Sequence, residues 1–182
     1  CRQIQLWDGL RNQPEGAAYL HKWIRRKELQ RQKFSLILKR KKRQEAAKMS
    51  IVFDKNLETG NETIDTQHKE LIARVNKLTE DCAVGKEKNV AVQTLDFLLD
   101  YTEFHFRDEE KLQEEKGYPL MAAHKDQHGK FVKAVGELRE MLEEEEGPTE
   151  AFVEAVKKNI VDWLVNHILV WDKQLALYVK EY

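Results

Sequence analysis

Five of the six histidines in this chain fall on apolar helical stripes, and no other feature constrains the fold as strongly. Imidazole is polar and needs partners when it is buried, so histidines at core positions are uncommon. One such residue on its own is usually structural. Five of them on four helices, with Glu109 and Asp172 in the same stripes, indicate a buried metal site instead. The histidines are His68, His105, His124, His128 and His167.

Four segments repeat apolar residues every three or four positions, which is the spacing of one face of an α-helix. Their other faces are rich in Lys, Glu, Asp and Gln, as expected for helix faces that are exposed to solvent. Gly85, Gly117 and the pair Gly147 and Pro148 separate the segments. The expected helices cover about 63–83, 88–115, 119–145 and 148 onward. Because the loops are short, the sequence predicts an all-α, up-down-up-down four-helix bundle.

Charge is divided unevenly along the chain, with a change at Met49. Residues 1–48 contain 14 Lys and Arg against 4 Asp and Glu, whereas the other 134 residues contain 17 against 28. We therefore expect a basic helical extension over 1–48 and the bundle over 49–182. Met49 would be an ordinary first residue, so the extension is interpreted as a linker or as a segment that is not native to the mature protein.

The basic run at residues 39–43 suits contact with an acidic partner, although a solvated charged helix is the simpler interpretation. Neither nucleic acid nor a membrane is expected as a partner of the bundle. No apolar stretch reaches the ~18–20 residues that span a bilayer, and no signal peptide is visible. Cys1 and Cys82 give no disulfide framework, so a reducing cytoplasm is the expected location.

The spacing of the candidate ligands places them on shared helix faces. His105 and Glu109 lie four residues apart, as do His124 and His128, so each pair projects from one face. Asp172 follows His167 by five residues, which in an ideal α-helix turns it about 140° away. Either a widened π-turn brings these two side chains together, or Asp172 reaches the site from an adjacent face.

The number of candidate ligands limits the kind of metal site. Five imidazoles and two carboxylates are too many for one tetrahedral zinc ion, and they suit two metals that share the carboxylates. Iron, manganese and zinc all accept these donors. The segment from His124 to His128 lacks the glutamate that a zinc protease places directly after its first histidine, so a zinc hydrolase is disfavoured.

Residues 50–182 resemble the hemerythrins, in particular the bacterial ones. The resemblance rests on the segments 64–68 and 105–110, on the pair His124 and His128, and on residues 163–172. It implies two iron ions joined by an oxo or hydroxo bridge, with dioxygen as the ligand. One iron would take His124, His128 and His167, the other would take His68 and His105, and Glu109 and Asp172 would bridge them.

The resemblance also implies reversible oxygen binding, for carriage, storage or sensing, rather than enzymatic activity. The alternative is a di-iron redox enzyme that acts on peroxide or nitric oxide. Phe53 stands where the family usually has a tryptophan in the arm before the first bundle helix. The family lines its oxygen pocket with apolar residues. Apolar residues at such spacings ordinarily pack in the core, and the same side chain can both pack in the core and line the pocket. The matching positions in this chain are Leu71, Phe106, Trp163, Leu164 and Ile168.

Overall fold

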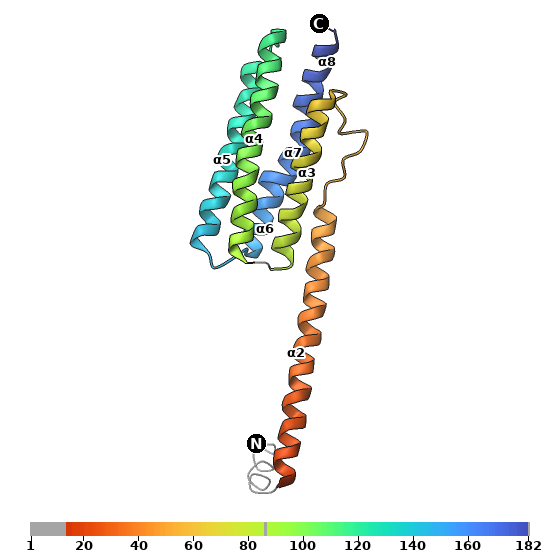
Figure 1. The fold of residues 1–182 in the computed structure, drawn as a ribbon, viewed down its shortest axis with the longest axis vertical. Coiled ribbons are helices and arrows are strands. Elements are labelled where there is room, and N and C mark those ends of the chain that lie inside the picture. The colour runs from red at the N-terminus through yellow and green to blue at the C-terminus, as the bar shows by residue number, and fades with distance from the viewer. Residues whose placement is uncertain (1–13, 86, 182) are drawn as a thin grey trace. The chain divides into compact units, whose positions relative to one another are not determined.

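Helices make up most of the computed structural model, which describes residues 14–85 and 87–181 (Figure 1). No strand occurs within these two ranges, and the predicted all-α fold is confirmed. The helices before the last bundle helix are α2 (Pro14–Met49), α3 (Glu62–Ala83), α4 (Lys88–Lys116) and α5 (Met121–Glu144). The last bundle helix is divided into α6 (Glu150–Val156), η1 (Lys157–Asp162), α7 (Trp163–His167), η2 (Ile168–Asp172) and α8 (Lys173–Glu181), where η marks a π-helical turn.

The chain divides into two compact units, and the boundary lies between Lys41 and Lys42. The basic extension predicted from the sequence is helical from Pro14 onward, and the helix α2 continues to Met49. Its side chains are exposed throughout residues 21–44, among them Trp23 and Phe34. None of the helices in the described part of the chain is long and apolar enough to cross a membrane.

The bundle is closed by contacts between successive helices. The helix α4 packs against both α3 and α5, and α5 packs against α6 and η1. Contacts of α3 with α6 and η1 complete the ring, so all four bundle helices enclose one core. The buried apolar residues lie on the predicted stripes, for example Val75, Leu98, Val135 and Ile160. This arrangement is the four-helix bundle that the sequence predicts (Figure 1).

The helix ends follow local chemistry. Asn61 caps α3 by accepting from the backbone N–H groups of Thr63 and Ile64, and Thr149 caps α6 in the same way. Gly117 adopts a left-handed conformation, with φ at 63°, and ends α4 as expected. The third bundle helix starts at Met121 rather than at Pro119, because Pro119 lies in a turn that the Met121 N–H closes on the carbonyl of Tyr118.

The arm before α3 is fixed to that helix by buried polar contacts. The Asn76 side chain donates to the carbonyl of Ile51 and accepts from its N–H, both at 2.8 Å. The buried carboxylate of Asp65 accepts from Thr59 N and Oγ1, at 2.7 and 2.8 Å, and from Gly60 N at 3.1 Å. Phe53 packs partly buried against the core. These contacts hold the arm in place against α3 at one end of the bundle.

Candidate metal centre

The seven candidate ligands meet inside the bundle, and each residue is at most 2% exposed. The helix α3 supplies one histidine, α4 a histidine and a glutamate, and α5 two histidines. The last bundle helix supplies a histidine from α7 and an aspartate from η2. In chain order these residues are His68, His105, Glu109, His124, His128, His167 and Asp172. His21 lies on α2 with an exposed side chain and has no place in this cluster.

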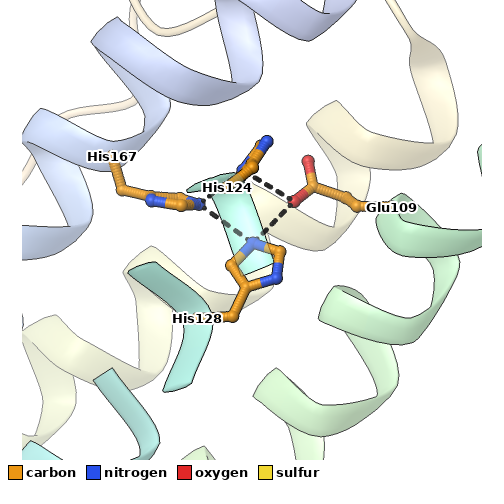
Figure 2. A group of neighbouring side chains, drawn as sticks. All are labelled: Glu109, His124, His128 and His167. Atoms are coloured by element: carbon orange, nitrogen blue, oxygen red, sulfur yellow. Dashed lines mark hydrogen bonds and ion pairs between the residues drawn. The ribbon is translucent and has the colours of Figure 1, made fainter. Parts of the chain in front are cut away.

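Three imidazoles and one carboxylate form the first group, in which all the ligand atoms lie within 4.8 Å of one another (Figure 2). The Nε2 atom of His167 lies 3.1 Å from Nε2 of His124 and 3.2 Å from Nε2 of His128. The Oε2 atom of Glu109 lies 3.3 Å from Nε2 of His128. Donor atoms from three helices therefore converge on one small volume, as the ligands of a metal ion do.

The second group contains His68 and His105 together with Glu109 and Asp172, again within 4.8 Å of one another. The Nε2 atom of His68 lies 3.1 Å from Oδ2 of Asp172, and that of His105 lies 3.8 Å from Oε2 of Glu109. The two imidazole rings meet edge to face, with their centroids 4.9 Å apart. A second metal ion would have two nitrogens and two carboxylates here.

Both carboxylates stand between the two groups. Oδ1 of Asp172 lies 3.1 Å from Nε2 of His124 and from Nε2 of His167, whereas its Oδ2 faces His68. Oε2 of Glu109 lies 3.8 Å from Nε2 of His124 and also from Nε2 of His105, so it faces one histidine of each group. This is the placement that carboxylate bridges between two metal ions require.

A π-turn brings Asp172 to the same face as His167. The turn covers Ile168–Asp172, directly after His167, so the five-residue spacing is accommodated by a widened turn rather than by a reach from the adjacent face. A second π-turn at Lys157–Asp162 was not predicted. Each of the two segments contains a pair of adjacent buried residues, Ile160 with Val161 and His167 with Ile168, but such pairs also occur in the regular helices, for example Leu71 with Ile72 on α3.

Hydrogen bonds on the far side of two imidazoles fix which nitrogen faces the site. Nδ1 of His105 lies 2.8 Å from Oε1 of Gln67, whose amide nitrogen donates to Asp108 at 2.7 Å. Nδ1 of His128 lies 3.2 Å from Oε1 of Glu110. Both partners are acceptors, so Nδ1 carries the proton and Nε2 keeps its lone pair for a metal.

The sequence pattern did not predict these hydrogen-bonding partners. Gln67 and Glu110 are each adjacent in sequence to a candidate ligand, and a polar residue next to a stripe is indistinguishable from one on the solvent face. Gln113 was missed for another reason. It is fully buried on α4, and its amide nitrogen, a hydrogen-bond donor, lies 3.0 Å from Nδ1 of His124. Its spacing of four residues from Glu109 was the signal that could have found it.

Burial favours the neutral form of three of the imidazoles. Loss of solvation lowers the pKa of His105 well below its ordinary value, lowers the pKa of His128 to about 2, and lowers that of His167. Burial also raises the pKa of Glu109 well above its ordinary value, and the charge of Asp172 adds to that rise. Neutral imidazoles are the form that binds metal, and a cation would relieve the repulsion between the two carboxylates.

Several polar atoms of the cluster have no hydrogen-bond partner although they are buried. They include both nitrogens of His68, both carboxylate oxygens of Glu109 and Oδ2 of Asp172. The 3.1 Å approach of His68 to Asp172 is therefore a close contact without the alignment of a hydrogen bond. Each unpaired buried polar group costs about 1–3 kcal/mol. Metal coordination would satisfy these lone pairs, so the residues fit a pair of metal ions.

Aromatic rings cover one side of the cluster. Phe106 stacks on the ring of His128, with centroids 3.8 Å apart and planes at 5°, and Trp163 stacks on His167 at 4.3 Å and 13°. The remaining residues of the expected oxygen pocket are fully or nearly fully buried in the hydrophobic core. They are Leu71, Leu164 and Ile168. The surroundings of the histidines are therefore apolar on this side.

Comparisons with known proteins agree with this geometry. The sequence profile of the Hemerythrin HHE cation binding domain matches residues 59–178. A bacteriohemerythrin of Methylococcus capsulatus is 38% identical over 109 residues, which cover 60% of this chain and 80% of the relative. A bacteriohemerythrin of Pseudomonas aeruginosa is 36% identical over 118 residues, which cover 65% of this chain and 74% of the relative.

Solved structures agree as well. The crystal structure of a wild-type hemerythrin superposes with a TM-score of 0.56 at 34% identity, covering 64% of this chain and 87% of that one. A point variant of hemerythrin gives a TM-score of 0.62 at 31% identity, covering 71% of this chain and 98% of that one. Fold and sequence therefore lead to the same family.

Proposed function

This chain belongs to the hemerythrin family, and we propose that it binds dioxygen reversibly at a pair of iron ions inside its four-helix bundle. The observation that carries the proposal is the convergence of five imidazoles and two carboxylates, all buried, in two groups that share Glu109. Oxygen carriage, storage and sensing all use such a site. We infer that the role in the cell is one of these three.

We assign the ligands as the resemblance implies. His124, His128 and His167 would hold one iron, and His68 and His105 would hold the other. Glu109 and Asp172 would bridge the two, which their contacts with both histidine groups support. The iron pair, when bound with its oxo or hydroxo bridge, supplies the electrons that reversible oxygen binding requires.

The protein's own residues orient the site and exclude water from it. Gln67 holds the ring of His105, and Glu110 holds that of His128, so both present Nε2 to the site. Phe106 lies flat against the face of His128, and Trp163 lies flat against the face of His167. An apolar surface at the site keeps out water and small anions, which slows irreversible oxidation of the iron.

The names of the reported relatives favour a binding protein over the enzymatic alternative. The donor set supports the same choice. Bundle proteins that activate oxygen at two metals use more carboxylates and fewer histidines. Neutral imidazole stabilises high oxidation states of iron less well than anionic oxygen does, so five histidines favour binding without further chemistry.

Iron analysis and oxygen uptake test the function together. The purified chain, expressed with added iron, is expected to contain about two irons per bundle. Its absorption spectrum should change on exposure to air and return when the oxygen is removed. A ratio near one, preferential filling by zinc, or oxygen that is consumed instead of returned would each contradict the proposal.

Replacing Leu71 or Leu164 by alanine is expected to make oxygen binding less reversible without lowering the iron content. Neither side chain can bind metal, and both are at most 3% exposed. The shortened side chains would let water and anions reach the site. The fraction of oxygen recovered after repeated aeration and deoxygenation measures the effect, which should exceed that of a distant core substitution.

Leu138→Ala is the matched control, because Leu138 is equally buried but lies on α5 two to three turns beyond the ligands. All three substitutions cost ~2–5 kcal/mol of stability, so the comparison belongs well below the melting temperature. Equal loss of reversibility in the control would mean that general loosening explains the result, and the pocket assignment would have no support.

We propose that residues 49–182 form the oxygen-binding domain and that residues 1–48 are dispensable to it. The apolar stripes and all seven ligands lie within the longer part, as does the family match at 59–178. Deletion of 1–48 should leave the melting temperature and the iron content nearly unchanged. A large drop in either would contradict this division. The cytoplasmic location and an acidic partner for the extension stay predictions.

A further inference from the structure

The helix α3 begins and α8 ends at the same end of the bundle (Figure 1). Residues of both helices line a cavity of about 140 Å³ there. Its rim includes Gly60 and Lys180, which are exposed, and its floor includes the buried side chains of Glu109 and Asp172. The cavity therefore joins the surface to two of the candidate ligands. Its lining includes none of the five residues that the resemblance assigns to the oxygen pocket.

The walls of the cavity are apolar. Leu175, Ala176 and Val179 line it from α8, and Ile64 and Leu112 line it from α3 and α4. One water molecule needs about 10–15 Å³ of such space, so the cavity has room for an ion with several waters. Thr59 and Asn61, the uncharged polar residues of the lining, belong to the arm beside Gly60. The polar positions are at the rim and at the floor.

One side of the rim is fixed and the other is movable. Asp65 holds Thr59 and Gly60 through three hydrogen bonds. Across from them, the ammonium group of Lys180 lies 3.4 Å from the carbonyl oxygen of Thr59, which is a weak contact for an exposed side chain. Exposed side chains change rotamer in picoseconds to nanoseconds. Lys180 can therefore cover or leave the opening without any change of the backbone.

We propose that this cavity is the path by which ferrous iron reaches and leaves the centre, with Lys180 as a movable cationic gate. The proposal rests on the proposed function, since it takes the centre to hold iron. The carboxyl groups of Glu109 and Asp172 at the floor provide oxygen ligands for a cation, and the other cavity residues named above as walls are apolar. The ammonium at the rim repels the same cation, so it slows passage in both directions until it swings aside.

The rate of iron release tests this path. The iron-loaded full chain is kept reduced under argon and mixed with ferrozine, and the coloured ferrous complex is followed over time. Val179→Phe fills the cavity and should slow release roughly tenfold, which corresponds to about 1.4 kcal/mol in the barrier. Leu177→Phe adds the same side chain at an exposed position of α8 and should leave the rate unchanged. Lys180→Met should accelerate release severalfold.

Equal rates for wild type, Val179→Phe and Leu177→Phe would overturn the proposal. So would rates that follow the melting temperatures of the variants, because release would then require unfolding. Ala176→Leu provides the same test if Val179→Phe does not fold. Iron content and oxygen uptake at equilibrium are measured for every variant. A wild type without iron would contradict the proposed function, whereas normal iron and oxygen binding with unaltered release rates would contradict the path alone.

Discussion

Glu109→Ala is expected to leave the protein with almost no iron, although six of the seven candidate ligands remain. The carboxylate of Glu109 belongs to both ligand groups, and its oxygen Oε2 faces histidines of each. Loss of this carboxylate therefore weakens metal binding at both ligand groups, whereas loss of one histidine weakens it at only one group. Iron content per chain should fall from about two to near zero under the loading conditions that fill the wild type.

Two substitutions control for a general effect of removing a charged or imidazole group. Glu114→Ala removes an exposed carboxylate from the same helix, and His21→Ala removes the histidine outside the cluster. Both variants should keep the wild-type iron content and absorption spectrum. If Glu109→Ala kept a normal di-iron spectrum, its assignment as a bridge would be wrong.

Removing the iron from the wild-type protein is expected to lower its melting temperature by roughly 10 °C. A ligand present at about 1,000 times its dissociation constant adds about 4 kcal/mol to the folded state. In a chain of this size, 1 kcal/mol corresponds to roughly 2–4 °C. Without metal, the core also keeps the unpaired polar atoms of His68, Glu109 and Asp172. Thermal unfolding followed by circular dichroism, before and after dialysis against a chelator, measures the shift.

The Glu109→Ala variant is the matched control for this experiment, because it has little iron to lose. Chelator treatment should leave its melting temperature unchanged, close to that of the metal-free wild type. Coincident melting curves of the loaded and the metal-free wild type would show that the cluster is stable without metal. The buried histidines and carboxylates would then have to be satisfied by other means.

Most of the bundle could be predicted because its signals are local. The stripe and the terminating glycine place the second bundle helix at about 88–115, and the structure gives Lys88–Lys116. The convergence of the candidate ligands could also be predicted, since a polar residue on an apolar stripe must point into the core. Their binding of metal stays a prediction. The partners of their outer nitrogens could not be predicted, because contacts such as Gln67 with His105 join different helices.

The π-turn at Lys157–Asp162 escaped prediction for another reason, whereas the one after His167 was one of two alternatives that the sequence left open. One additional residue in a turn changes the periodicity of a 32-residue segment too little to stand out from ordinary scatter in core positions. The exception was the spacing of His167 and Asp172, where two chemically distinctive side chains had to share a face. The cavity was equally hidden, since it depends on how the arm at Thr59 and Gly60 meets the last turns of α8.

The π-turn after His167 has a consequence for the rest of the helix that contains it. An additional residue in one turn rotates everything that follows by about 100° relative to an uninterrupted α-helix. The phase of α8 is thus set by the same turn that delivers Asp172, and Leu175 and Val179 face the cavity as a result. A one-residue deletion within Ile168–Asp172 would rotate Asp172 and the cavity residues of α8 together. The orientation of the ligand therefore cannot be changed in this way without changing that of the cavity wall.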